Sequence, residues 1–326
     1  MRLQGEKNGK SKDCQDEMTV MRVSIIGAGR NKNGIGEYIG KYFHRNGAEV
    51  TSVLGRTEET TQRASSNLEK YEIKSKPYTD FHEMVEKERP DTLVIASPSS
   101  THHDYLVQGV GLGLNIFCEK PFVTPNLDDM KGKVEKILQK AKEKRLTVAM
   151  NSQWPFALIY YRKICGEIEI RKSNRFFITL SPFTSGRDMI SEAVPHALSL
   201  LYSVLGEGEM GNLVFEFSIE EEMTIKFKYL FGKKDCEVLI KLVRKEEQPR
   251  EFQFGFNDKI VKRSLNLKTY DIYFNYGNRK WKIADPLELS VKEFIKAVEK
   301  RTDPLVGSSH ILCSMSLLKK VCDGYH

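Results

Sequence analysis

The sequence predicts an α/β protein in which a doubly wound parallel sheet is followed by an α+β domain with a large, mostly antiparallel open sheet. Between residues 21 and 150, short apolar segments alternate with helical patterns, as they do in a parallel sheet with crossover helices. Beyond residue 150 the apolar residues follow a period of two, which is typical of antiparallel strands with one exposed face. A chain of 326 residues with 40% hydrophobic content is long enough for two domains, which we place at 21–150 and 151–326 after a flexible extension at 1–20.

The first domain begins with a buried strand at 21–26 that runs into a glycine turn and a helix at 36–46, followed by a strand at 49–54. Glycine lets a dinucleotide pyrophosphate approach the backbone, and the free N–H groups at the helix start bind the anion. The third glycine of the usual spacing is replaced by Lys32, so we interpret residues 31–34 as an insertion after which Gly36 takes that role. The turn therefore predicts a dinucleotide site formed by Gly27, Ala28, Gly29, Arg30, Gly34 and Gly36.

A charged lysine follows a later strand of the same domain. A strand at 93–96, a helix at 106–113 and a strand at 115–118 lead into Glu119-Lys120-Pro121, and a last parallel strand is expected at 147–150. In open parallel sheets ligands bind beyond the carboxyl ends of the strands, so Lys120 is placed to exchange a proton with a substrate. The alternative is that Glu119 and Lys120 form a solvated pair in a loop closed by Pro121.

The second domain is predicted to hold strands and a few covering helices. The alternation predicts strands at 213–219, 223–231, 238–242, 252–256 and 270–276. Helical patterns at 192–205, 287–300 and 310–321 are expected to cover the inner face of this sheet.

Four motifs in order resemble one family over roughly residues 21–326: the glycine turn, Pro98 followed by His102, Glu119-Lys120-Pro121, and Glu192 four residues before His196. The family is that of the NAD(P)-dependent oxidoreductases typified by glucose-fructose oxidoreductase and inositol dehydrogenase (Gfo/Idh/MocA), whose members usually have aspartate in place of Glu192. The resemblance implies a Rossmann domain and a substrate-binding and oligomerisation domain. It also implies that the catalytic residues are Lys120, His196 and Glu192, and that the cofactor is bordered by Ser97, Pro98, His102, Glu119 and Lys120.

The residue types suit oxidation of an alcohol, in which a hydride leaves carbon and a proton leaves oxygen. His196 is the best candidate base because an imidazole titrates near pH 6.5. Glu192 lies one helical turn earlier, where it would orient His196 or bind a substrate hydroxyl, and Lys120 would polarise the substrate oxygen. The alternative is a structural Glu192–His196 pair on the helix surface, or half of a metal site.

The end of the second strand bears on the choice of cofactor. An NAD-preferring fold usually has Asp or Glu there to bind the ribose hydroxyls, whereas this strand runs into Gly55-Arg56-Thr57. Arg56 can contact a 2′-phosphate in bidentate fashion, and Thr57 can donate a hydroxyl. NADP is therefore favoured, while Glu58 and Glu59, in the next helical turn, keep NAD possible.

Composition limits the partners and the compartment. The net charge of +7 lies mainly on solvated faces such as the helix from residue 130, without the aromatic platform that binds nucleic acid. No apolar segment approaches the roughly 20 residues of a membrane helix, the N-terminus lacks a signal-peptide core, and the six cysteines lack zinc spacing. We expect a cytoplasmic protein with a small-molecule substrate and no metal, nucleic-acid or membrane partner.

Two further expectations concern assembly and activity. The outer face of the second sheet is expected to form a homodimer or homotetramer, unless Lys226, Lys228, Lys241 and Glu216 simply make that face soluble. The expected activity is hydride transfer between nicotinamide and a polyol, sugar or related carbonyl compound. The alternatives are a catalytically silent dinucleotide-sensing regulator and a hydrolase that uses a tightly bound NAD.

Overall fold

The computed structural model of the chain describes residues 20–29, 34–219 and 221–325; Arg30, one of the residues assigned to the dinucleotide site, lies outside them. The first sheet is wholly parallel, with the strand order β3-β2-β1-β4-β5-β6. This is the order of a doubly wound dinucleotide-binding sheet and confirms the predicted fold class. Its strands are β1 (Arg22–Ile26), β2 (Glu49–Leu54), β3 (Lys76–Tyr78), β4 (Thr92–Ile95), β5 (Asn115–Glu119) and β6 (Val148–Asn151).

Helices cover both faces of this sheet because its strands are apolar on both sides. Side chains of β1 alternate between two cores: Val23 and Ile25 join one, and Ile26 joins the other. The first core is closed by α1 (Gly36–Arg45) and α2 (Glu58–Glu69), and the second by α3 (Phe81–Glu88), α4 (His102–Leu112) and α5 (Met130–Glu143). Helix α5 turns its apolar residues inward and its lysines outward, as its sequence pattern predicts.

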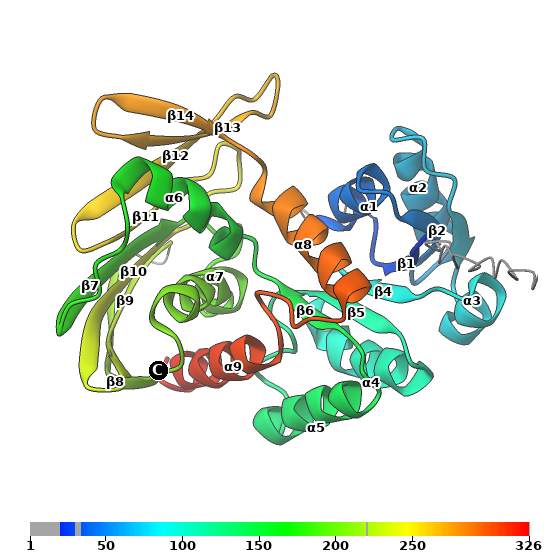
Figure 1. Cartoon of the computed structure of the whole chain (residues 1–326), viewed down its shortest axis with the longest axis horizontal. Helices are drawn as coiled ribbons and strands as arrows, with labels where there is room; N and C mark the ends of the chain where they lie inside the picture. The colour runs from blue at the N-terminus through cyan, green and yellow to red at the C-terminus, as the bar shows by residue number, and fades with distance from the viewer. Residues whose placement is uncertain (1–19, 30–33, 220, 326) are drawn as a thin grey trace, which may run out of the picture.

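The C-terminal part of the chain supplies one more helix to the first sheet. Helix α8 (Pro286–Lys300) packs beside α1, with Phe294 against the rings of Phe43 and Phe117 at centroid distances of 6.0 and 5.2 Å (Figure 1). The Tyr42 hydroxyl also donates to Asp285, the N-cap of α8, at 2.6 Å. The expectation that this helix covers the second sheet is therefore wrong. Its amphipathic pattern shows that one face is buried but not which sheet buries it.

The second sheet has the order β14-β13-β12-β11-β7-β10-β9-β8, and only the β7–β10 pair is parallel. The mostly antiparallel sheet is thus confirmed. Its strands are β7 (Ser173–Leu180), β8 (Glu209–Ile219), β9 (Glu222–Phe231), β10 (Lys234–Val243), β11 (Phe252–Phe256), β12 (Lys259–Leu265), β13 (Ile272–Tyr276) and β14 (Arg279–Ile283).

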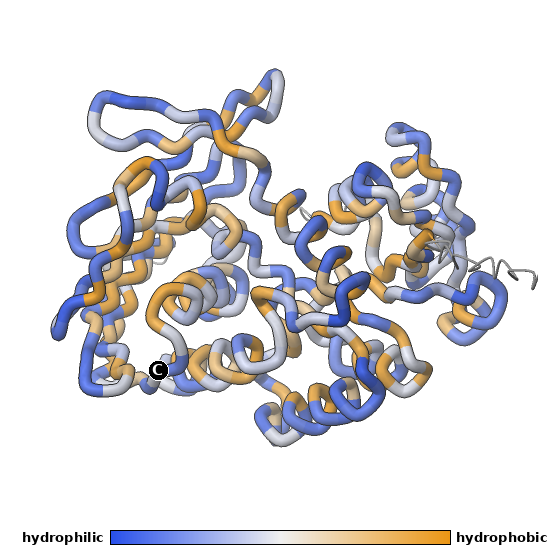
Figure 2. The backbone as a smooth tube through the Cα atoms, viewed as in Figure 1, coloured by the Kyte–Doolittle hydropathy of each residue, from blue (hydrophilic) through white to orange (hydrophobic). Residues whose placement is uncertain are grey.

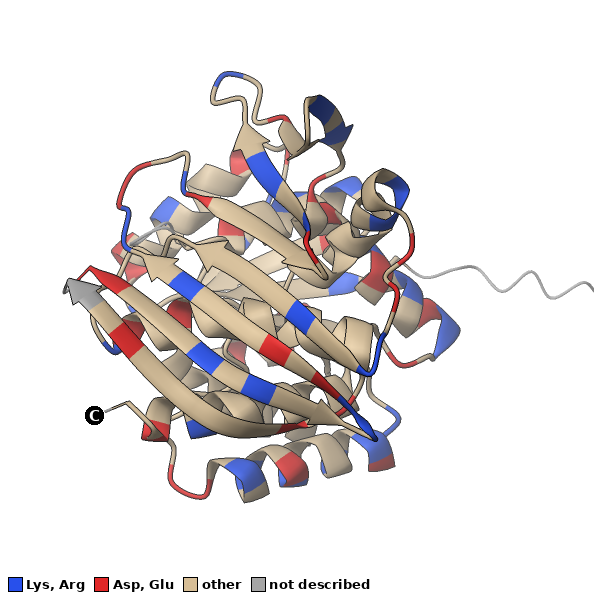
Figure 3. Cartoon of the chain, turned by 90° about the vertical axis from the view of Figure 1, so that its left-hand side faces the viewer, with Lys and Arg blue, Asp and Glu red and all other residues tan. Residues whose placement is uncertain are grey.

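Two long helices pack on one face of this sheet, namely α7 (Asp188–Leu205) and α9 (Ser308–Asp323), and the short α6 (Leu158–Cys165) lies near β13. Hydrophobic segments run along the strands and along α7 and α9 (Figure 2). On the opposite face, Figure 3 shows strands without a covering helix and with charged residues of both signs. None of the helices in the described ranges is long and apolar enough to cross a membrane.

Candidate functional site

The glycine turn after β1 is shaped by two close approaches. Gly27 has φ +85°, and a Cβ there would lie 2.6 Å from the backbone nitrogen of Ser97. A Cβ on Gly36 would lie 2.6 Å from the Gly27 carbonyl oxygen, so Gly36 allows α1 to pack onto the turn, as interpreted for the third glycine. At Gly29 the nearest atom to a Cβ would be 3.9 Å away among the described residues other than its chain neighbours, so these residues leave room there for a ligand. The turn therefore fits a dinucleotide pyrophosphate.

The residues after β2 lie on the surface at the start of α2. Arg56 is exposed, and Thr57 is the N-cap of α2, where its hydroxyl accepts from the Thr60 N–H at 3.2 Å. Glu58 and Glu59 form the first helical turn, as expected. Because its hydroxyl already caps the helix, Thr57 would have to share that group with a phosphate.

His102 lies behind the site and does not line it. The side chain is 1% exposed, with Nε2 2.8 Å from the Ser97 carbonyl and Nδ1 3.0 Å from the Pro121 carbonyl. The pKa of His102 is lowered, and burial is the largest cause of this shift. The imidazole thus joins the loop of Ser97 and Pro98 to the loop of Lys120 and Pro121, so its effect on a cofactor would be to position these loops.

Lys120 points across to α7. Its Nζ donates to the backbone carbonyl of Glu192 at 2.5 Å, and the side chain is partly buried. Glu119 points elsewhere and accepts a hydrogen bond from the Asn151 amide, whose oxygen accepts from Ser290 of α8 at 3.1 Å. The alternative of a solvated Glu119–Lys120 pair is therefore wrong. Burial raises the pKa of Glu119 to about 7, although Lys120 and Asn151 act in the opposite direction.

His196 lies one helical turn beyond the carbonyl that Lys120 contacts. Its Nδ1 is 3.2 Å from the hydroxyl of Ser152, a fully buried residue just past β6. Burial and, second, the charge of Lys120 hold the pKa of His196 well below its usual value, so the imidazole is neutral at pH 7. This contact occupies Nδ1 and leaves Nε2 as the ring nitrogen that Ser152 does not use.

Glu192 is committed to the loop before its helix. Its carboxylate accepts from the backbone N–H groups of Phe183 and Thr184 and from the Thr184 hydroxyl, at 2.8–3.0 Å. These donors and Lys120 lower the pKa of Glu192 against the effect of burial. The expectation that its carboxylate orients His196 is wrong, because Ser152 is the group bound to that ring.

Sequence reasoning missed Asn151, Ser152 and Arg250. The first two follow a buried strand directly, and the strand-end argument that identified Lys120 applies to them equally. Arg250, 3.6 Å from the Glu192 carboxylate, lies in an irregular segment and has no comparable signal. Across the described ranges, no group of three His, Cys, Asp or Glu side chains is arranged to hold a metal ion.

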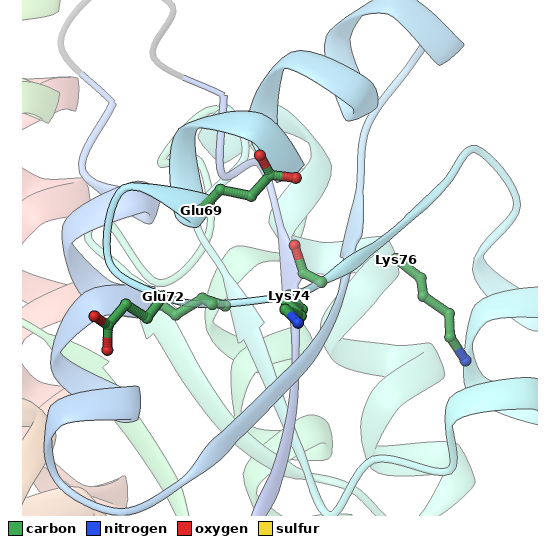
Figure 4. Close-up of a pocket in the computed structure, with 6 residues that line it drawn as sticks. Glu69, Glu72, Lys74 and Lys76 are labelled. Carbon is green, nitrogen blue, oxygen red and sulfur yellow. The ribbon is translucent and has the colours of Figure 1, made fainter.

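A hollow on the far side of the first domain does not belong to this site. Its lining includes Glu69, Glu72, Lys74 and Lys76 (Figure 4). These residues join the end of α2 to the start of β3, at the amino-terminal edge of the parallel sheet. The glycine turn, Lys120 and Ser152 all follow the carboxyl ends of their strands.

The fold combines a parallel sheet with the strand order of the dinucleotide-binding class and a second, mostly antiparallel sheet. Residues 21–152 match the family model described as "Oxidoreductase family, NAD-binding Rossmann fold" (GFO_IDH_MocA), which covers the parallel-sheet part of the chain. Inositol 2-dehydrogenase of Salmonella typhimurium (strain LT2) is 29% identical over 82 residues, which are 25% of this chain and 24% of that protein. The rhizopine catabolism protein MocA of Rhizobium meliloti is 33% identical over 105 residues, or 32% of this chain and 30% of that protein. The match thus spans less than a third of either relative.

The whole fold has relatives among solved structures. UDP-N-acetylglucosamine 3-dehydrogenase GnnA from Acidithiobacillus ferrooxidans superposes with a TM-score of 0.69 at 15% identity. The superposition covers 93% of this chain and 97% of that one, so the likeness extends through the second domain. At this identity it concerns the fold alone.

Proposed function

We propose that this protein is an NAD(P)-dependent dehydrogenase or reductase that acts on an alcohol or carbonyl group of a small polyol or sugar. One observation carries the proposal. Beyond the carboxyl ends of β5 and β6, the Lys120 ammonium donates to the Glu192 carbonyl of α7, one helical turn before His196, and its charge helps to hold the pKa of that imidazole low. The named activity of one relative, inositol 2-dehydrogenase, supports the same class of substrate.

The chemistry divides between cofactor and side chains. A bound nicotinamide supplies the hydride transfer. Nε2 of His196 accepts the hydroxyl proton during oxidation, and the low pKa of the ring keeps it unprotonated and ready to do so. Lys120 places a positive charge where the substrate oxygen becomes negative. Ser152 fixes the imidazole ring, and its hydroxyl can accept from or donate to Nδ1, so both neutral tautomers are supported.

The residues of the chain also bear on which cofactor is used. The Gly27 turn, with Gly29 open to solvent and α1 beginning at Gly36, would hold the pyrophosphate. Exposed Arg56 and the absence of a carboxylate at the end of β2 favour NADP, because a guanidinium matches a 2′-phosphate. Binding of NAD through the first turn of α2 is the competing outcome.

Pairing of two copies through the outer face of the second sheet forms part of the proposal. Charges there already neutralise one another, as in Lys226–Glu216 at 2.6 Å and Lys241–Glu222 at 3.8 Å, around the half-exposed Val214 and Leu230. Such a face can enter an interface without isolated charges. Light scattering of the wild type and of Leu230→Glu tests it: a monomeric wild type contradicts the proposal.

The activity itself is tested by a panel of polyols and sugars with NADP and NAD, followed at the nicotinamide absorbance band. Consumption of cofactor in step with substrate supports the dehydrogenase. Turnover of a glycoside with a cofactor that is retained and not consumed points to the NAD-dependent hydrolase instead. Cofactor binding without turnover of any member of the panel points to a regulator.

A further inference from the structure

Arg250 is a mostly buried cation with incomplete pairing at the substrate side of the site. Its side chain is 15% exposed and lies 5.6 Å over the Phe183 ring, with Nη1 3.6 Å from Glu192. Among the residues that the structure describes, neither Nε nor Nη2 has a hydrogen-bond partner. Charge-assisted hydrogen bonds are usually 2.7–2.9 Å long, so the contact with Glu192 is loose. Arg250 therefore keeps unused donor capacity in a buried place, which is costly unless something else uses it.

The two unused nitrogens form one edge of the guanidinium. Nε and one Nη carry parallel N–H bonds, the fork that binds both oxygens of a carboxylate or phosphate. Glu192 does not fill this fork, since its carboxylate approaches Arg250 from the Nη1 side and is held there by the Phe183 and Thr184 N–H groups.

A second buried guanidinium increases the positive charge. Arg263 donates to the Arg250 carbonyl at 2.6 Å and stacks over Trp154 and Phe252 at 5.6 and 5.8 Å. Burial and, next, the charge of Arg250 lower the pKa of Arg263 to about 10. Two neighbouring guanidinium groups, with Lys120 across Glu192, make this region rich in positive charge, while Glu192 faces Arg250 and the charge of Asp285 acts on Arg263.

We propose that Arg250 binds an oxyanion of the substrate, so that the substrate class is a polyhydroxy acid or polyol phosphate and not a neutral polyol. This rests on the proposed function, because it places the anion on the molecule whose alcohol faces His196. Both fork nitrogens are shielded from solvent. Binding therefore requires the segment between β10 and β11 to move. The measured affinity includes the free-energy cost of that movement.

The test is calorimetric binding to the full chain without dinucleotide, using D-gluconate, D-glucitol 6-phosphate and neutral D-glucitol. We expect at least one anion to bind about 10- to 150-fold more tightly than D-glucitol, as for a charge-assisted contact. Which anion prevails distinguishes a carboxylate from a phosphate. Equal binding of all three, or no binding of either anion, overturns the inference without any variant.

Variants of Arg250 test whether this residue is the one that binds the anion. Arg250→Gln should abolish the preference for the anion, and Arg250→Lys, which keeps the charge but lacks the fork, should retain only part of it. Arg244→Gln is the matched control, since Arg244 contacts Phe183 too, through its backbone carbonyl, but pairs with Glu221 and Glu246. A preference that survives in folded Arg250→Gln overturns the proposal. If neutral polyols are oxidised as efficiently as acids, the proposal for Arg250 is overturned and the dehydrogenase proposal stands. If an anion binds but no cofactor is turned over, the proposal for Arg250 stands and the result counts against the dehydrogenase.

Discussion

The Ser152 hydroxyl lies 3.2 Å from Nδ1 of His196 and joins the end of β6 to the middle of α7. The contact links the two domains at the point where the chain passes from one to the other. It also occupies the position expected for a carboxylate, because Glu192 is held by the loop of Phe183 and Thr184. An uncharged partner leaves the imidazole easier to keep neutral than a carboxylate would.

Ser152→Ala should lower kcat by about 2- to 12-fold, since a hydrogen bond contributes about 0.5–1.5 kcal/mol. Cofactor affinity should not change. The measurement is steady-state kinetics with fluorescence titration of the dinucleotide. Ser199→Ala is the control, because it removes another buried serine–histidine contact, with His310 at 2.9 Å, away from the site. Equal losses in the two variants would show that the effect is structural.

Lys120→Ala and His196→Ala should each reduce turnover by roughly 10²–10⁴-fold, the usual contribution of a positioned acid or base. Folding and dinucleotide binding should be nearly intact. Kinetics on the true substrate, together with circular dichroism, provides the check. Full activity in both variants would refute the mechanism.

Gly29→Val should abolish dinucleotide binding without lowering the melting temperature, because its Cβ would enter open space where the pyrophosphate is expected. Gly27→Ala should instead destabilise the fold by about 1–3 kcal/mol, since the residue has φ +85° and its Cβ would meet Ser97 at 2.6 Å. Calorimetry of binding and of unfolding separates the two effects. Unchanged affinity in Gly29→Val would remove this turn from the site.

Arg56→Ala should lower the affinity for NADPH by about 10- to 150-fold, which corresponds to the loss of a charge-assisted contact of about 1.5–3 kcal/mol. NADH lacks the 2′-phosphate and should bind the variant almost as it binds the wild type. Fluorescence titration with both cofactors measures this. A wild type that prefers NADH, or equal weakening of both cofactors, would contradict the NADP assignment and leave the dehydrogenase proposal standing.

Glu119→Gln should gain stability relative to the wild type as pH rises. The pKa of Glu119 is about 7 in the fold against an ordinary 4.5. Between these values the native state binds more protons than the unfolded chain, so this carboxyl makes stability fall with rising pH. Gln cannot ionise, so the variant's melting temperature should rise relative to the wild type by roughly 2–5 °C from about pH 5 to about pH 8. Glu58→Gln, at an exposed position, is the control for the amide; a pH-independent difference in Glu119→Gln would be the contrary result.

Periodicity located five of the six strands of the first sheet, each a short apolar run closed by a turn, and β2 agrees with its predicted range. It gave no signal for β3, because Lys76-Pro77-Tyr78 has no apolar run. It failed for β7, which lies between β10 and β11 in the middle of the second sheet. In Arg175-Phe176-Phe177-Ile178 both faces carry apolar residues, so no clean alternation marks the strand. The motifs located Lys120 and His196 because they are local in sequence. Arg250 reaches Glu192 across 58 positions through tertiary packing alone, which no local pattern encodes.

The position of α8 also sets the order in which the protein can be completed during synthesis. Phe43 and Phe117 can pack against Phe294 only after α8 has been synthesised, although β6, the last strand of their sheet, ends at Asn151. At about 5–20 residues per second, the ribosome needs roughly 7–27 s for the ~135 residues between Asn151 and Pro286. During that interval the face of the sheet beside α1 is left apolar and uncovered. The nascent first sheet therefore exposes apolar surface until α8 has been synthesised.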